Sequence, residues 1–291
     1  MTSFADLEIR SVELPQGTVE YRETGSGPTV VLLHGLLVAG SLWRDVLPRL
    51  APDFRVVVPE LPLGCHRIPL RADADVSPPG VAKLVADFMA ALELDDVTLV
   101  GNDTGGAISQ LVAAHHPERI GRLVLTPCDA YDNFLPAMFK PLQALAHVPP
   151  LMNATLRGMR LRALRLAPLA FGWLMKRPDD ELVKSWVDAT LSNKAARRDA
   201  MKLLRAVSKR QTLEAAERLR SFEKPVLLAW APEDRFFKLR YAERLAEDIP
   251  DARLEHIEDS LSFVPVDQPA RTAELIAAFA REPRSAAAAA T

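Results

Sequence analysis

Short apolar runs that alternate with helical patterns constrain the fold of this 291-residue chain more than any other feature. Uninterrupted apolar stretches of this length are typical of strands buried on both faces, and not of strands with one wet face. The runs occupy residues 29–33, 55–58, 97–100, 122–126 and 226–230, and a further strand is predicted at 252–257. Helical patterns between such strands predict a parallel sheet with helices on both faces.

Two more strands are predicted before the first apolar run. Residues 7–13 and 18–23 alternate between polar and apolar side chains and are joined by the turn residues Pro15-Gln16-Gly17, which indicates a half-exposed hairpin. Helices are predicted over 41–50, 78–94, from the Gly101–Gly106 turn to His116, and over 239–248 and 269–281. The fold class is therefore α/β, with a mostly parallel eight-stranded sheet covered by helices on both faces.

Residues 133–220 differ from the rest in texture and in charge. They contain no β-like run, show helical periodicities broken by several prolines, and carry seventeen Lys and Arg against seven Asp and Glu. We expect an inserted helical cap here, set into a core formed by residues 1–132 and 221–284. The alanine-rich end, residues 285–291, is predicted to be a disordered tail.

The composition excludes several classes of function. The 36 Lys and Arg nearly balance the 38 Asp and Glu, so no overall charge favours nucleic acid or a membrane surface as partner. Two cysteines, Cys65 and Cys128, cannot build a disulfide scaffold or a thiolate-rich metal site. The first residues lack the features of a signal peptide, and no apolar run has membrane-spanning length. We expect a cytoplasmic protein with a small-molecule substrate, no metal and no cofactor, while its oligomeric state stays open.

The turn Gly101-Asn102-Asp103-Thr104-Gly105-Gly106 follows a predicted strand and precedes a predicted helix. Small residues on both sides of Asp103 permit a sharp strand-to-helix bend that lifts the middle side chain above the sheet. Serine is the usual residue at such a bend, but a carboxylate is ionised at neutral pH and needs no base before it attacks carbon. The alternative interpretation is that Asp103 only caps the helix.

A second motif, His34-Gly35-Leu36-Leu37, follows the first apolar strand. A glycine turn at this place lets the backbone amide of Leu36 point toward the amide of Thr104. Two converging amides of this kind form an oxyanion hole. We therefore expect Asp103, Leu36 and Thr104 to form one catalytic group, with His34 beside it.

At this point the chain resembles the α/β-hydrolase superfamily. The resemblance is carried by His34-Gly35, the bend around Asp103, Pro117–Ile120 before a strand, and Ala231–Arg235 after a late strand, and it covers nearly the whole chain. An aspartate at the bend is similar to the branch of haloalkane dehalogenases and soluble epoxide hydrolases. In that branch the aspartate attacks carbon, and a histidine-activated water then hydrolyses the ester. The resemblance places Asp234 at the position of the triad acid.

The branch's histidine position holds serine in this chain. In the stretch from Asp259 to Pro269, Phe263, Asp267 and Pro269 fall in register with the family pattern, and Ser262 stands where the histidine is expected. A hydroxyl cannot hold a proton at neutral pH as imidazole does. His66, in the loop after the second apolar strand, is the best substitute base.

Asp129 and Asp132 are alternative acids, and His147 lies in the predicted cap. The resemblance also implies an asparagine after the His-Gly and a tryptophan after the nucleophile as halide ligands, or tyrosines in the cap for epoxides. This chain has Leu36 and Thr104 at the first two positions and no tyrosine within residues 133–220, so neither specific activity is predicted.

The substrate site is predicted to include His34, Asn102, Tyr131, Ser262, Phe263 and His147 under a lid rich in methionine and aromatic residues. Such a lid suits an adaptable apolar pocket. The sequence predicts an enzyme that acts on a small or medium apolar substrate and hydrolyses an alkyl halide-, epoxide- or ester-like bond through Asp103. Two alternatives remain: a lyase, isomerase or cyclase that uses Asp103 for proton transfer, and a catalytically silent ligand-binding relative.

Overall fold

The computed structural model describes residues 3–282, so the predicted disordered tail at 285–291 lies outside the described residues. Eight strands form one sheet in the order β1-β2-β4-β3-β5-β6-β7-β8. Their bounds are β1 Ile9–Leu14, β2 Gly17–Thr24, β3 Thr29–Leu33, β4 Arg55–Pro59, β5 Val97–Asp103, β6 Ile120–Cys128, β7 Val226–Trp230 and β8 Ala252–His256.

The sheet is parallel from β4 to β8, as predicted. The hairpin of β1 and β2 is antiparallel, and β2 pairs antiparallel with β4. All other pairs are parallel, including β3 with β5 and β5 with β6. This confirms the predicted mostly parallel eight-stranded sheet, and it places the ends of β3, β5, β6 and β7 along one edge.

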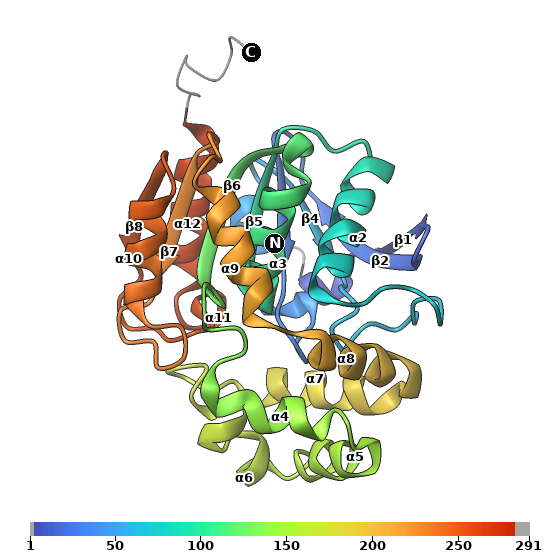
Figure 1. Ribbon diagram of the computed structural model, residues 1–291. Helices are drawn as coiled ribbons and strands as arrows, with labels where there is room; N and C mark the ends of the chain where they lie inside the picture. The colour runs from blue at the N-terminus through green and yellow to red at the C-terminus, as the bar shows by residue number, and fades with distance from the viewer. Residues whose placement is uncertain (1–2, 283–291) are drawn as a thin grey trace.

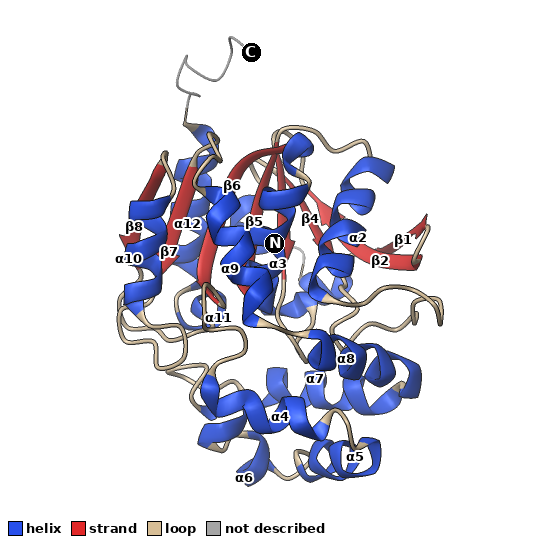
Figure 2. Ribbon diagram, viewed as in Figure 1, coloured by secondary structure: helices blue, strands red, loops and turns tan. Residues whose placement is uncertain are grey.

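Helices cover both faces of the sheet (Figure 2). On one face α2 (Pro78–Ala91), α3 (Thr104–His115), α9 (Lys209–Leu219) and α10 (Leu239–Asp248) pack side by side. On the other face α1 (Leu47–Leu50) packs against α12 (Pro269–Arg281), with α11 (Val264–Asp267) beside it. Short helical turns are η1 Phe4–Asp6, η2 Gly40–Trp43 and η3 Pro117–Arg119.

The helix predicted over 41–50 is instead split into η2 and α1. Pro48 lies inside this stretch and has no N–H to donate to the carbonyl of Arg44, so the helical ladder is interrupted there and α1 starts with this proline in its first turn. The chain therefore forms two short helical pieces. Leu42 and Trp43 still reach the core from the first of them.

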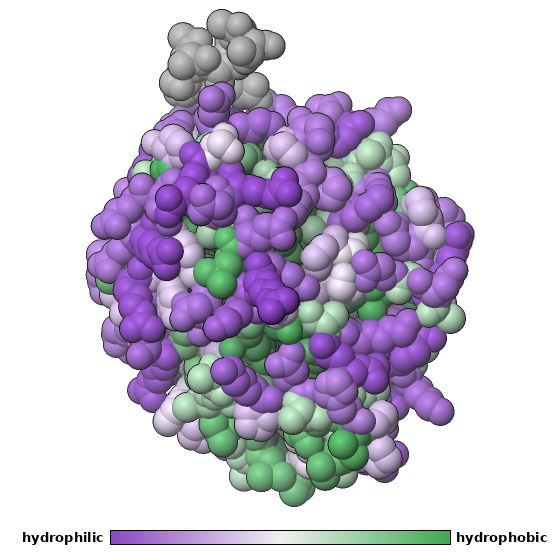
Figure 3. Space-filling model, viewed as in Figure 1, coloured by the Kyte–Doolittle hydropathy of each residue, from purple (hydrophilic) through white to green (hydrophobic). Residues whose placement is uncertain are grey.

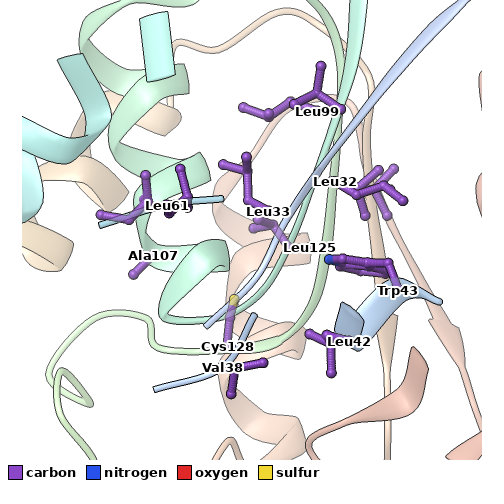
Figure 4. Packing of buried hydrophobic residues seen from close by; sticks show 14 of the residues in the cluster. Leu32, Leu33, Val38, Leu42, Trp43, Leu61, Leu99, Ala107, Leu125 and Cys128 are labelled. Atoms are coloured by element: carbon purple, nitrogen blue, oxygen red, sulfur yellow. The ribbon is translucent and has the colours of Figure 1, made fainter. Parts of the chain in front are cut away.

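Successive side chains of the central strands fill both layers of the core. Figure 4 shows Leu32 and Leu33 on opposite sides of their strand, Leu32 beside Trp43 and Leu33 beside Leu61. All four side chains are almost completely buried. This alternation is why the predicted runs are apolar at every position rather than at every second one.

Between β6 and β7 the described chain contains helices and no strand. They are η4 Ala137–Phe139, α4 Lys140–Leu145, α5 Pro149–Gly158, α6 Arg162–Arg165, η5 Pro168–Gly172, α7 Asp180–Ser192 and α8 Lys194–Ala206, followed by α9. Figure 1 shows α4 to α8 gathered at one end of the molecule, below the sheet, whereas α9 runs up beside α3. The segment thus stands over the edge where the central strands end.

Candidate active site

Asp103 lies at the end of β5 in a backbone conformation that non-glycine residues rarely adopt, with φ 56° and ψ −132°. The bend turns directly into α3, and Gly105 permits it: a Cβ there would lie 2.5 Å from the carbonyl oxygen of His34. The strand ends of β3 and β5 and the start of α3 therefore meet without side chains between them. This is the sharp strand-to-helix bend that the sequence predicts.

The Asp103 carboxyl group rests against the glycine turn after β3. A Cβ on Gly35 would lie 2.7 Å from both Cβ and Cγ of Asp103, so only glycine leaves room for this side chain. The backbone N–H of Thr104 donates to Oδ1 of Asp103, and the Thr104 hydroxyl donates to the same oxygen over 3.0 Å. Asp103 thus accepts a cap-type hydrogen bond from its own helix, but its carboxyl group also faces a cavity.

The cavity over Asp103 has a volume of about 320 Å³ and is mostly apolar. Asp103, Thr104 and Thr155 are the polar residues in its lining, which otherwise includes Leu36 and Leu37 from the β3 turn, Phe237, and residues from the segment after β6. That last group is Leu135, Pro136, Met138, Phe139, Pro141, Leu142, Leu145, Met159, Leu169, Ala170, Phe171 and Leu174. Much of the predicted methionine- and aromatic-rich lid therefore lines the space that a substrate would fill.

Burial raises the pKa of Asp103 to about 6, although the two hydrogen bonds from Thr104 act in the opposite direction. A carboxyl group with this pKa is mostly ionised at neutral pH and yet exchanges protons readily. Both protonation states are therefore accessible to chemistry near pH 7.

Asp234, after β7, is held in place by three donors on one oxygen. The N–H groups of Phe236 and Phe237 donate to Oδ1 over 2.7 and 2.9 Å, and the Ser262 hydroxyl donates to it over 3.1 Å. The other oxygen, Oδ2, is buried without a hydrogen-bond partner. Burial, with a smaller contribution from the charge of Asp103, raises the pKa of Asp234 to about 7.

Asp129, one of the two predicted alternative acids, is a buried carboxyl group close to Asp103. It directly follows Cys128, the β6 residue paired with Asp103, and its side chain is completely buried with neither oxygen hydrogen-bonded. Burial and the neighbouring charge of Asp103 hold the pKa of Asp129 well above its usual range. Asp132, the other predicted alternative acid, is exposed. Of the two carboxyl groups, Asp103 therefore ionises more readily than Asp129.

Asn102 ties the strand ends to the loop that carries Ser262. Its amide nitrogen donates to the carbonyl oxygen of Ser262 over 2.8 Å and to Oγ1 of Thr126 over 2.9 Å. Phe263, which follows Ser262 in the sequence, is fully buried and packs edge-on against Trp186, with ring centroids 5.8 Å apart. Neither Asn102 nor Phe263 lines the cavity, so both support the site from behind.

His34 is engaged through both ring nitrogens. Nε2 accepts the N–H of Leu61 over 2.9 Å, so Nδ1 carries the proton and donates to the carbonyl oxygen of Gly35 over 3.0 Å. Complete burial lowers the pKa of His34 to about 4, and the ring is therefore neutral at physiological pH. His34 fixes the glycine turn beside Asp103.

Three predicted site residues lie away from the cavity. His66 is buried, and its Nε2 lies 3.3 Å from Oδ2 of Asp199 on α8. This contact gives His66 a structural role and directs the ring away from the role of a base at Asp103. Tyr131 donates its hydroxyl to Asp248 over 2.9 Å, and His147 is exposed. None of the three lines the cavity. Leu36 does line it, while the direction of its amide stays a prediction.

Two other kinds of site were sought in the described residues. Within residues 3–282 no group of three or more His, Cys, Asp and Glu side chains is arranged to hold a metal ion. None of the helices in the same range combines the length and the apolar character that a membrane-spanning helix requires.

Known proteins resemble this chain over most of its length. A family model described as alpha/beta hydrolase fold matches residues 28–269. A haloalkane dehalogenase 2 of Mycobacterium tuberculosis is 29% identical over 281 residues, covering 93% of this chain and 94% of that protein. A 2-hydroxy-6-oxononadienedioate/2-hydroxy-6-oxononatrienedioate hydrolase 1 of Dechloromonas aromatica is 28% identical over 246 residues, covering 81% of each. The solved structure of a thermophilic esterase from Thermogutta terrifontis superposes with a TM-score of 0.75 at 20% identity, covering 94% of this chain and 98% of that chain.

Proposed function

The chain belongs to the alpha/beta hydrolase fold family, and on that premise we propose that it is an enzyme whose nucleophile is Asp103. Its carboxylate attacks an electrophilic carbon of a small or medium apolar substrate, such as an alkyl halide, an epoxide or an ester-like compound. The new bond joins an Asp103 oxygen to that carbon, and the carbon's bond to the leaving group breaks with its electron pair. The haloalkane dehalogenase among the relatives supports this chemistry.

One observation carries the proposal: the carboxyl group of Asp103 faces a mostly apolar cavity of about 320 Å³ from a strained bend. The backbone strain at Asp103 costs free energy, on the order of 1–3 kcal/mol, which a residue that only capped a helix would not need. The mostly apolar lining favours an uncharged substrate, and a substrate that fills the cavity would strengthen the nucleophile by displacing water from it.

The second half of the reaction, hydrolysis of the ester on Asp103, lacks its usual base. It requires that a water lose a proton as it attacks the ester carbonyl. The resemblance places Ser262 at the family's histidine position, and its hydroxyl donates a hydrogen bond to Asp234. We therefore expect alkylation of Asp103 to be faster than release of the product.

A second candidate function is proton transfer, as in a lyase, isomerase or cyclase. The pKa of Asp103, raised to about 6, and the pKa of buried Asp129, raised well above its usual range, favour this candidate. A carboxylate in an apolar cavity can remove a proton from carbon and return it elsewhere without forming a covalent bond. Such an enzyme would need no histidine at residue 262.

We also propose that the segment from residue 133 acts as the lid of this cavity. Because α9 packs against α3 on the core, the part of the segment that covers the site ends before Ser208, the N-cap of α9. The remaining helices supply most of the cavity lining. A movement of these helices would open or close the site without disturbing the sheet.

Intact-protein mass spectrometry after exposure to a primary alkyl bromide and to a terminal epoxide tests the proposal. Alkylation adds the mass of the alkyl group to the protein, and peptide mapping should locate it on Asp103. The Asp103→Asn variant is expected to gain no such mass, whereas Asp45→Asn, an exposed carboxylate, should behave like the wild type. Absence of both an adduct and product formation would overturn the nucleophile proposal and favour the proton-transfer or silent alternative.

A further inference from the structure

The surface of the lid combines exposed hydrophobic side chains with an excess of positive charge. Nine large hydrophobic side chains stand exposed among residues 3–282, and six of them lie within residues 138–169. We call these six the apolar tip: Met138, Val148, Leu151, Leu161, Leu164 and Leu169. Leu161 and Leu169 are each 65% exposed. Clustered exposure of this kind marks an interaction surface.

The residues of the apolar tip belong to the helical segment at one end of the molecule. Figure 3 shows hydrophobic surface gathered at the end of the molecule where Figure 1 places α5 and α6, while polar side chains cover most of the rest of this face. A Cβ on Gly158 of α5 would contact Leu164 of α6 at 3.3 Å, so the two helices touch there.

The segment that carries the apolar tip has an excess of positive charge, and its acidic neighbours, Asp180 and Asp188, belong to α7. Residues 133–178 contain five arginines and two lysines but no Asp or Glu. Arg165 is buried in a bidentate pair with Asp180, and exposed Arg162 shares that same carboxylate. Arg157 and Lys140 are exposed and form no ion pair with the described residues. The overall charge of −2 hides this local excess.

We propose that the apolar tip docks on an anionic lipid surface. Exposed leucines gain free energy only where they leave water, and arginines and lysines gain it near negative headgroups; a lipid interface offers both at once. Nucleic acid would pair with the positive charges but would not bury the exposed leucine side chains. A second copy joined through this face would bring two basic segments together, and like charges would oppose each other across the interface.

The cavity over Asp103 and the docking surface share two residues. Met138 and Leu169 belong to the apolar tip and also line the cavity over Asp103. An apolar compound dissolved in the lipid would therefore reach Asp103 without crossing water. This consequence for the substrate rests on the proposed function, whereas docking itself does not.

Co-sedimentation with vesicles tests the docking. The wild type is expected to bind vesicles of equimolar phosphatidylcholine and phosphatidylglycerol at least about tenfold more tightly than vesicles of phosphatidylcholine alone, and added salt should weaken the binding. The Asp103→Asn variant should bind as the wild type does, so loss of catalysis and loss of docking are separable.

Two pairs of variants locate the contact. The double variant Leu161→Asp with Leu164→Asp should lose at least about tenfold in vesicle affinity, because it removes apolar area and adds negative charge. Leu213→Asp, an exposed leucine on α9 outside the tip, is its control. Arg157→Gln with Arg160→Gln should also bind more weakly, and Arg49→Gln with Arg281→Gln should not.

Three results would overturn the proposal. One is no binding to the mixed vesicles. Another is equal binding by the Leu161/Leu164 variant and the wild type. The third is a dimer in analytical ultracentrifugation that the same variant abolishes, which would assign the apolar tip to a second copy of the chain.

Discussion

The hydroxyl of Ser262 donates a hydrogen bond to Oδ1 of Asp234 over 3.1 Å, and both side chains are buried and do not line the cavity that Asp103 faces. In the resemblance to dehalogenases and epoxide hydrolases, a histidine would make this contact with the acid and relay a proton from water. The serine keeps the contact and cannot hold the proton. If Asp103 is the nucleophile, as proposed, a serine at this position leaves the first half of the reaction competent and impairs the second half.

Ser262→His should restore the second half. The imidazole would replace the hydroxyl as donor to Asp234, whose Oδ2 is buried and without a partner. We expect an alkyl adduct on Asp103 that persists in the wild type to disappear with time in the variant, followed by intact mass. The larger ring could cost about 1–3 kcal/mol of stability through overpacking.

Ser262→Gln is the control for Ser262→His, because glutamine adds bulk and a donor but no titratable nitrogen. If glutamine accelerates adduct loss as much as histidine does, then proton transfer at residue 262 is not the cause. If neither variant changes a persistent adduct, the position is not in register with the family histidine.

Gly35→Ala is predicted to impair the site directly. Its new Cβ would lie 2.7 Å from Cβ and Cγ of Asp103, and the alternative is a shift of the β3 turn. We expect at least about a hundredfold slower alkylation of Asp103, since a displaced nucleophile loses its approach geometry. Gly158→Ala on α5 is the matched control. There the nearest atom is the exposed Leu164 side chain at 3.3 Å, and alkylation should proceed at the wild-type rate.

Asp129→Asn is predicted to stabilise the protein in a pH-dependent manner. The folded pKa of Asp129 is raised, so the folded state holds a proton that the unfolded chain releases above about pH 4. The stability that this proton provides is therefore full in acid and falls as the pH rises. Asparagine cannot ionise and so removes that loss, and the variant should be more stable than the wild type at pH 7.

Urea unfolding at pH 4 and at pH 7 measures this effect. The gain of Asp129→Asn over the wild type should be near zero at the lower pH and clear at the higher one. Asp132→Asn, three residues on and exposed, should show no such difference. A gain that is equal at both pH values would contradict a protonated Asp129.

The sheet and the bend at Asp103 could be predicted because their signals are local. Buried parallel strands are apolar at successive positions, and the Gly101–Gly106 sequence specifies a bend within six residues. The match of Ser262 to the family's histidine position was predicted from Phe263, Asp267 and Pro269, which lie within seven positions of it. In the structure its hydroxyl contacts Asp234, the residue that the resemblance places as the acid.

Contacts between distant segments could not be predicted from local patterns. His66 pairs with Asp199, 133 positions away, and Tyr131 pairs with Asp248, 117 positions away. Because the sequence does not show these partners, His66 and Tyr131 were predicted to be free to act in the site. Asp129 shows the converse case, because nothing in its neighbours along the chain indicates that both oxygens are buried without a partner.

Thr104→Val is predicted to shift the pH dependence of Asp103 alkylation. Only the carboxylate attacks carbon, so the rate should rise with pH and reach half its maximum near pH 6, where Asp103 titrates. The Thr104 hydroxyl donates to Oδ1 over 3.0 Å and stabilises the charged form. Valine has nearly the same shape but lacks that donor, so the pKa of Asp103 and the midpoint should rise by roughly one pH unit.

Thr104→Ser keeps the hydroxyl, and its midpoint should stay close to that of the wild type. The backbone N–H of residue 104 still donates to Asp103 in both variants, so neither should abolish alkylation. Alkylation rates from pH 5 to pH 8, read by intact mass, separate the two. An unchanged midpoint in Thr104→Val would show that the hydroxyl does not contact the ionised nucleophile, and the charge on Asp103 would then depend on the backbone amide alone.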